Sequence, residues 1–181
     1  VSITNSVSAI ARIESPPLIP LRTCQLRGRQ GWLGTRVHPA RFTLMATGTH
    51  DYASDQRNDE ILIWVNGTLK PRNEAVVSVF DSGFVLGDGV WEGIRVHHGQ
   101  PAFLEAHLDR LWEGATALMI NIGLTREELS AAIYETLAAN DMHDGVHIRL
   151  MVSRGVKSTP YQDPRLTIGA ATVVIIAEHK E

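Results

Sequence analysis

Hydrophobic and polar residues alternate with a period of two in several short segments of this chain. In residues 90–97 and 146–153 most of the side chains at every second position are apolar, which is typical of a strand with one buried face. The run at 172–177 is continuously apolar and suits a strand that is covered on both faces. Asn66-Gly67 follows another apolar run and supplies the positive φ angles of a tight hairpin. The predicted strands are 61–65, 75–80, 90–97, 146–153 and 172–177.

Two segments between these strands have the helical period instead. The first helix is predicted over 104–119. Its apolar stripe consists of Leu104, Leu108, Leu111, Ala115 and Leu118. A capping box, Thr125 with Glu128 three residues later, marks the start of the second helix, predicted over 125–140. This order of elements predicts an α+β fold, with a mixed or antiparallel sheet of about five or six strands and both helices on one face.

The first 44 residues differ in composition from the rest. They include a proline pair, six arginines and a single acid, Glu14, and they show neither period. An arginine-rich, acid-poor segment is typical of an organelle transit peptide; the interpretation that we favour is translated sequence upstream of a start at Met45. We therefore expect an extension, 1–58, that does not fold with the rest, and a folded domain, 59–181.

The charge of the predicted domain argues against nucleic-acid binding. The chain has 17 basic and 20 acidic residues, and without the first 44 residues 11 basic and 19 acidic residues remain, a net charge of −8. The single cysteine, Cys24, excludes a disulfide framework, and eight histidines without zinc-type spacing predict no metal site. No run approaches the roughly 20 apolar residues of a membrane span, so we expect a cytoplasmic protein.

Two predicted strands carry basic residues opposite their apolar side. These opposite sides consist of Trp91, Gly93, Arg95 and His97 on one strand and His147, Arg149, Met151 and Ser153 on the other. A basic face without an acid, in an acidic domain, predicts an anionic ligand such as a carboxylate or a phosphate. The alternative is a solvated outer face, which alternation also produces. Trp91 and Gly93 favour a site, because an exposed indole is costly and a glycine in a strand often marks the close approach of a ligand.

Arg110 on the first predicted helix is a further candidate cation. At 100° per residue, it lies on one flank of the apolar stripe together with His107 and Gly114. His107 lies one helical turn before Arg110, and Gly114, one turn after it, has no side chain. This arrangement would suit a bound phosphate. The alternative is an ordinary arginine that extends into solvent beside Asp109 and Glu113.

The glycine-rich segment 83–89 is not a phosphate loop, because it leads into a strand and lacks the Gly-Lys-Ser/Thr ending. It belongs to a longer run, DSGFVLGDGVWEGIR at 81–95, which is followed by Gly99 and by HLDRL at 107–111. Together these motifs resemble the N-terminal signature of fold-type IV pyridoxal-phosphate enzymes. That family includes branched-chain aminotransferases, D-amino-acid aminotransferases, R-selective amine transaminases and aminodeoxychorismate lyases. The resemblance extends over 61–181 and implies the small N-terminal domain of that fold.

The resemblance implies a cofactor, pyridoxal 5'-phosphate, and roles for six residues. Arg110 matches the arginine that binds the cofactor phosphate. The residues that match the substrate pocket are Trp91, Gly93, Arg95, His147 and Arg149. The two arginines of this set match residues near the substrate carboxylate of branched-chain aminotransferases, and the histidine stands where those enzymes often have a tyrosine. The implied partners are amino-acid and 2-oxo-acid substrates and a second copy of the chain in a homodimer.

The sequence also departs from the family pattern. Leu86 and Trp91 stand where branched-chain enzymes usually have a tyrosine and a phenylalanine, and no Arg-x-His pair of the D-amino-acid type follows 153–155. In this family the Schiff-base lysine belongs to a second domain, so we expect it beyond Glu181 and expect no catalytic residue in this chain. The lysines that do not match its position are Lys70, Lys157 and Lys180. The chain alone is then expected to be inactive.

We interpret the intact protein as a branched-chain-like transaminase, which passes an amino group from an amino acid or amine to a 2-oxo acid. The alternative within the family is an aminodeoxychorismate lyase. The sequence EGIR at 92–95 favours the transaminase, because the lyases usually have Thr-x-Arg there. A third interpretation is a truncated domain that acts only by binding or dimerising.

Overall fold

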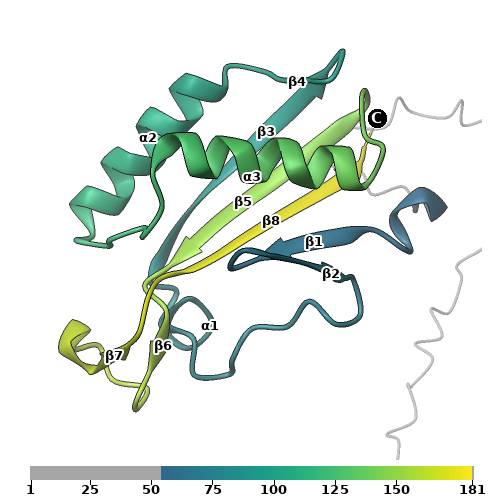
Figure 1. Cartoon of the computed structure of the whole chain (residues 1–181). Helices are drawn as coiled ribbons and strands as arrows, with labels where there is room; N and C mark the ends of the chain where they lie inside the picture. The colour runs from purple at the N-terminus through teal and green to yellow at the C-terminus, as the bar shows by residue number, and fades with distance from the viewer. Residues whose placement is uncertain (1–53, 181) are drawn as a thin grey trace, which may run out of the picture. The chain divides into compact units, whose positions relative to one another are not determined.

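The computed structural model describes residues 54–180; the arginine-rich segment, Cys24 and Met45 lie outside the described residues. Its main feature is a six-stranded sheet in the order β2-β1-β8-β5-β3-β4, in which all neighbouring strands are antiparallel (Figure 1). The strands of this sheet are β1 (Leu62–Val65), β2 (Thr68–Pro71), β3 (Gly89–His97), β4 (Gln100–Pro101), β5 (Val146–Ser153) and β8 (Thr172–His179). A separate pair consists of β6 (Val156–Lys157) and β7 (Thr167–Ile168).

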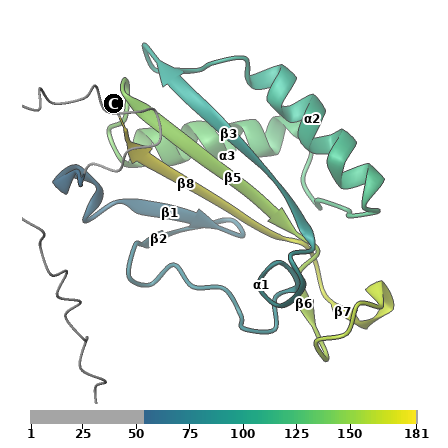
Figure 2. The ribbon, with the colours of Figure 1, turned by 180° about the vertical axis from the view of Figure 1, so that it is seen from behind.

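Both long helices cover the same face of the large sheet. Helix α2 spans Leu104–Ala117 and packs on β3, whereas α3 spans Arg126–Ala139 and packs on β8 and β1. They lie in front of the strands in Figure 1 and behind them in Figure 2, so neither long helix of residues 54–180 covers the second face of the sheet. The predicted α+β fold, with two helices on one face of an antiparallel sheet, is confirmed.

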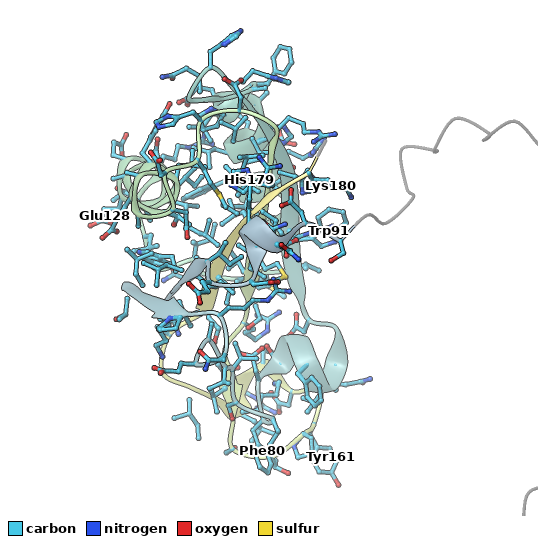
Figure 3. All side chains as sticks on the ribbon, turned by 90° about the vertical axis from the view of Figure 1, so that its right-hand side faces the viewer. Phe80, Trp91, Glu128, Tyr161, His179 and Lys180 are labelled. Carbon is cyan, nitrogen blue, oxygen red and sulfur yellow. The ribbon has the colours of Figure 1, made fainter. Side chains whose placement is uncertain are left out.

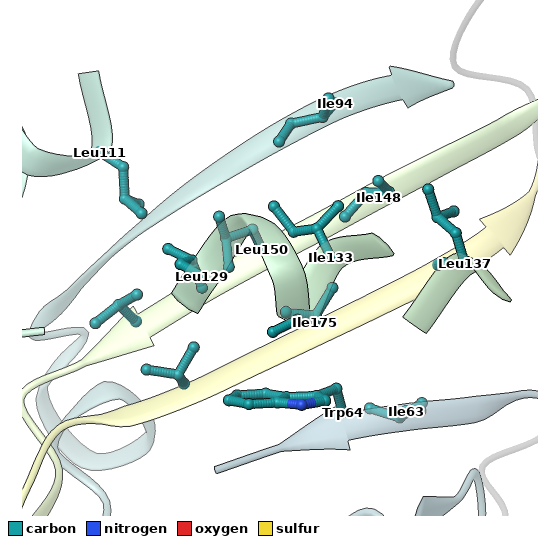
Figure 4. Close-up of a cluster of buried hydrophobic side chains, with 14 of the residues drawn as sticks. Ile63, Trp64, Ile94, Leu111, Leu129, Ile133, Leu137, Ile148, Leu150 and Ile175 are labelled. Carbon is teal, nitrogen blue, oxygen red and sulfur yellow. The ribbon is translucent and has the colours of Figure 1, made fainter. Parts of the chain in front are cut away.

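The hydrophobic core lies between the helices and the sheet (Figure 4). Strand β5 buries every second residue along its whole length, which is the predicted period of two. The side chains that meet in this core include Ile94, Leu111, Leu129, Ile133, Ile148, Leu150 and Ile175. Burying a side chain of this size stabilises the fold by roughly 1.5–3 kcal/mol. Since one face of β3 and β5 is used in this way, their remaining side chains must face away from the helices.

The local signals that start the second helix and the hairpin are confirmed. The side chain of Thr125 accepts a hydrogen bond from the backbone N–H of Glu128 at 3.1 Å, and the Glu128 carboxylate accepts one from the backbone N–H of Thr125 at 2.8 Å. Asn66 and Gly67 have φ angles of 49° and 88° and connect β1 to β2.

One predicted strand is wrong. Residues 75–80 form no strand, and the partner of β1 is β2, which follows directly after the hairpin. The apolar residues of the segment, Val76, Val77, Val79 and Phe80, are exposed. A segment can pair with β1 only if one edge of β1 is free. Here β1 already pairs with β2 on one side and with β8 on the other.

The glycine-rich connection before β3 contains a short helix, α1 (Ser82–Leu86). It begins at Asp81, whose Oδ1 accepts a hydrogen bond from the backbone N–H of Gly83 at 2.8 Å. Gly87 ends it with a φ of 68°, a left-handed conformation that favours glycine. A shaped connection into the strand was expected, but this helix was not.

The residues before β1 are attached to the sheet. A single 3-10 turn, η1 (Gln56–Asn58), ends at Asn58, whose side chain donates to the carbonyl of His179 at 3.0 Å and accepts from its N–H at 2.8 Å. The amide of Asn58 therefore acts like a further strand residue beside β8. The other 3-10 turn, η2 (Pro164–Leu166), leads into β7.

Two searches of residues 54–180 give negative results. No helix there is long and apolar enough to cross a membrane. Within the same range, no three histidine, cysteine, aspartate or glutamate side chains are close enough together to hold a metal ion.

Candidate active site

The five residues predicted to line a substrate pocket lie together on the face of the sheet without helices. Strands β3 and β5 are paired so that Gly93 is opposite Arg149 and Arg95 is opposite His147. Directly opposed residues share a face of the sheet. Trp91 lies on the same face as Gly93 and Arg95, because the three alternate along β3. Figure 3 shows Trp91 on the side of the sheet opposite the helix α3.

Trp91 and Arg149 form the centre of this face. The guanidinium carbon of Arg149 lies 4.1 Å from the centroid of the indole ring, a cation–π contact that fixes the plane of the guanidinium. The side chain of Trp91 is nevertheless 61% exposed. A large aromatic surface of this kind, stacked on a cation, is available to a ligand or to another part of the protein.

Gly93 makes room for the imidazole of His147. A Cβ atom at Gly93 would lie 3.1 Å from Nε2 of His147, closer than nearly all real contacts of this kind. Burial lowers the pKa of His147, and the neighbouring cations Arg149, Lys180 and Arg95 lower it further. The imidazole is therefore neutral near pH 7 and can donate one hydrogen bond and accept another.

The face is not free of acids, which corrects the sequence interpretation. Glu178 of β8 is directly opposite His147 and shares its face, and it acts against the lowering of the histidine pKa. Arg95 is also partly engaged, because its Nη1 donates to the backbone carbonyl of Lys180 at 2.5 Å. The sequence pattern compared only two strands, and these contacts come from the third strand, β8, and the residue after it.

Arg110 pairs with a buried carboxylate on the other face of β3. Its Nε donates to Oε1 of Glu92 at 2.7 Å, and its Nη2 donates to Oε2 of the same side chain. Nδ1 of His107 lies 2.8 Å from Oε2. Glu92 is only 3% exposed, and its pKa is lowered by the hydrogen bonds from Arg110 and His107, against the effect of burial. This carboxylate is therefore ionised and doubly bound.

Neither sequence interpretation of Arg110 included this pairing. The neighbouring acid Asp109 binds Arg126 at 2.6 Å, so it is not the partner of Arg110. Gly114 does not leave space beside the arginine: a Cβ there would lie 3.1 Å from Val90, so this glycine allows α2 to approach β3. Glu92 was missed as a site residue. The available signal was a lone acid among the apolar residues on the core side of its strand.

Arg110 and the five pocket residues lie on opposite faces of β3. Strand β3 pairs with β5 along its whole length, but with β4 only at Val96 and His97. Among the residues that the structure describes, no strand pairs with the other edge of 89–95. Only β3 separates Arg110 from the pocket residues, and one edge of that strand is open among the described residues.

A cavity of about 410 Å³ lies beside Trp91, between α1 and the ends of the strands. Its apolar lining includes Val77, Phe84, Met151 and Val174. The cavity was not predicted, because it depends on where the irregular segment before α1 lies. It extends the site from a charged centre at Arg149 to an apolar end at Phe84.

Arg154 fixes the loop that forms one wall of this cavity. Its Nε and Nη2 donate to the two carboxylate oxygens of Asp88 at 2.6 and 3.0 Å. Its Nη1 donates to the carbonyl of Met119 at 2.9 Å, and Nη2 also donates to that of Leu118 at 2.8 Å. One side chain therefore connects the loop after α1, the end of β5 and the end of α2. Sequence reasoning assigned no role to it.

The three lysines of residues 54–180 lie in different parts of the domain. Lys157 is 2% exposed, and its Nζ donates to the backbone carbonyl of Asp163 at 2.9 Å. Lys70 lies on the edge strand β2, and Lys180 follows β8 at the surface. Lys180 is also one of the cations near His147. That the reactive lysine is none of these three stays a prediction.

The chain is similar to known aminotransferases and to a related lyase. The family model described as "Amino-transferase class IV" matches residues 89–180. Two branched-chain-amino-acid aminotransferase-like proteins of Arabidopsis thaliana are 37% identical over 164 residues (91% of this chain, 27% of the relative) and 44% identical over 123 residues (68% and 22%). The aminodeoxychorismate lyase of Bacillus subtilis is 35% identical over 96 residues, covering 52% of this chain and 33% of the lyase.

Among solved structures, the branched-chain aminotransferase of the archaeon Thermoproteus uzoniensis with norvaline has a TM-score of 0.56 and 30% identity, and the match covers 66% of this chain and 40% of that one. The fold, the motifs and these matches define a protein of the aminotransferase class. The chain belongs to the class IV aminotransferase family. It spans about a quarter of the length of the two plant relatives.

Proposed function

We propose that the protein containing this chain is a pyridoxal-phosphate-dependent transaminase of the branched-chain type, and that this chain supplies part of its phosphate and substrate pocket. The observation that carries the proposal is the arrangement around the open edge of β3, with the Arg110 guanidinium on one face and the Trp91–Arg149 pair on the other. A cofactor that spans this edge would reach both groups. When bound, pyridoxal phosphate supplies the electron sink that amino-group transfer requires.

Arg110 is the residue of this chain that fits the cofactor phosphate. Two of its nitrogens are bound to Glu92, while Nη1 has no hydrogen-bond partner among residues 54–180. A guanidinium with one free N–H edge can donate a charge-assisted hydrogen bond to a phosphate oxygen. The side chain is 67% exposed, so this edge is accessible.

The opposite face fits a substrate carboxylate. Arg149, held against Trp91, offers a guanidinium in a fixed plane, and neutral His147 beside it offers one donor or acceptor. Arg95 contributes positive charge, although one of its nitrogens is bound to the carbonyl of Lys180. The apolar cavity beside Trp91 would exclude water from a hydrophobic substrate side chain. These features support an amino acid with an apolar side chain and its 2-oxo acid as substrates.

We also propose that the protein is a homodimer in which this open face is covered. Five apolar side chains on or near it, Val76, Val79, Phe80, Phe84 and Trp91, are exposed in this chain. Monomeric proteins rarely leave so many apolar side chains together in solvent. The cytoplasmic location stays a prediction.

The assignment of Arg110 is tested by measuring cofactor retention in the holoenzyme. We expect Arg110→Ala to weaken the affinity for pyridoxal phosphate by at least about tenfold, because a charge-assisted hydrogen bond to the phosphate is lost. Arg126→Ala is the matched control, since it removes an exposed arginine that binds Asp109 on the outer surface. Equal cofactor affinity in Arg110→Ala and the wild-type protein would contradict the assignment.

A further inference from the structure

Glu92 is a buried carboxylate to which no function has so far been given. It lies on the core side of β3 between Val90 and Ile94, where every other side chain of that strand face is apolar. Burying a charge in such a place is costly unless the charge is bound. Here both oxygens accept hydrogen bonds from Arg110, and one of them also contacts His107. The core therefore holds the carboxylate in a defined position, and the carboxylate in turn contacts an exposed cation.

Arg110 would be mobile without this contact. Its side chain is 67% exposed, and a solvent-exposed arginine samples many rotamers. The paired contact through Nε and Nη2 fixes both the position and the plane of the guanidinium. Nε and Nη2 are bound to Glu92, and Nη2 also lies 3.4 Å from Nδ1 of His107, so Nη1 is the nitrogen that remains for a ligand.

We propose that Glu92 is a positioning residue, which holds the guanidinium of Arg110 in a fixed plane with its Nη1 edge directed to an anion. We call the paired contact between Glu92 and Arg110 the clamp. That the anion is the cofactor phosphate rests on the proposed function, whereas the clamp itself does not. Glu92 and Arg110 together carry no net charge. The site therefore recognises its anion by directed hydrogen bonds from a preorganised donor rather than by an excess of positive charge.

The clamp can be tested on the chain as it stands, without a cofactor. In nitrogen-15 NMR spectra of the wild-type chain, we expect the Nε–H of Arg110 to give a separate signal that exchanges slowly with water, because it is bound to a buried oxygen. Glu92→Gln should accelerate this exchange by about tenfold or more, since a charged acceptor is replaced by a neutral one. Glu113→Gln is the control, because it removes an exposed acid three residues from Arg110 on the same helix. Rapid exchange in the folded wild-type chain would overturn the proposal even if Glu92→Gln did not fold.

The positioning role is tested in the holoenzyme. Removing Glu92 has two opposed effects on a bound phosphate: the donor loses its orientation, and a negative charge near the phosphate disappears. Glu113→Gln reports the charge effect alone. We expect Glu92→Gln to weaken the affinity for pyridoxal phosphate by about tenfold, and Glu113→Gln to leave it unchanged or slightly stronger. Equal or stronger binding in Glu92→Gln would show that Glu92 competes with the phosphate for Arg110. A wild-type protein that binds no pyridoxal phosphate, but has the slow Nε–H signal, would reject the proposed function and keep the clamp.

Discussion

His147 shows how the surroundings of one residue set its charge. Its imidazole is partly buried beside three cations, Arg149, Lys180 and Arg95, so protonation is disfavoured in the folded protein and its pKa lies below the ordinary value of 6.5. In the unfolded chain the same group titrates near that ordinary value. The unfolded chain therefore binds more protons than the folded protein at mildly acidic pH.

This difference predicts a pH-dependent stability. The stabilising contribution of neutral His147 is fully present above the unfolded pKa and is lost as the pH falls toward the lower pKa of the folded state. We expect the free energy of unfolding to decrease less between about pH 7.5 and about pH 5 in His147→Gln than in the wild-type protein. His97→Gln, an exposed residue on the same strand, should keep the wild-type slope. Identical slopes for wild type and His147→Gln, from denaturant titrations, would argue against a depressed pKa.

At the residue scale, the sequence predicted which side chains share a face but not which ones bind each other. The period of two placed Trp91, Arg95 and Arg149 together, because parity along a strand is local information. The pairing of Arg110 with Glu92 depends on how α2 packs across β3, and this distance between elements is not encoded in any short pattern. The contact of Glu178 with His147 required the order of strands in the sheet.

At the scale of secondary structure, Arg154 connects three elements. It binds the carboxylate of Asp88 in the loop after α1 and the carbonyls of Leu118 and Met119 directly after α2, and both charged side chains are mostly buried. Helix ends leave carbonyls without partners, and an arginine that satisfies two of them also fixes the end of the helix.

Replacing Arg154 should therefore reduce stability much more than replacing an exposed arginine. We expect Arg154→Gln to lower the free energy of unfolding by about 2–4 kcal/mol, because Asp88 loses its partner and two carbonyls lose theirs. Arg126→Gln breaks an ion pair with Asp109 and a contact of 5.2 Å with the Trp112 ring, and it should cost about 1 kcal/mol. Urea titrations of both variants give the comparison. Similar losses for the two would mean that the connection at Arg154 contributes little.

The elements themselves were predictable to different degrees. Both helices and the strands β3, β5 and β8 follow from apolar periods and from the capping box at Thr125. The segment 75–80 has strand-like composition but forms no strand, and β1 offers it no free edge because it pairs with β2 and β8. Its valines are exposed, so strand-forming residue types alone did not determine the structure of this segment.

At the scale of the whole molecule, one face of the sheet is covered by α2 and α3 and the other is not. This second face holds the Trp91–Arg149 pair and the apolar cavity, which the exposed side chain of Phe84 also lines. The match with the Thermoproteus uzoniensis aminotransferase covers 40% of that chain. Arg110 and the pocket residues are the part of the proposed active site that this chain supplies.

The central claim is most directly tested by following the amino group in the cofactor-loaded protein that contains this domain and the domain with the reactive lysine. A branched-chain L-amino acid labelled with nitrogen-15 is supplied together with a 2-oxo acid. The account predicts that the label appears in the amino acid formed from the acceptor, in an amount equal to the 2-oxo acid formed from the donor. Release of pyruvate from aminodeoxychorismate without amino transfer would instead identify a lyase. Neither reaction, in a protein that is folded and loaded with cofactor, would contradict the assignment of an enzyme active site to this face.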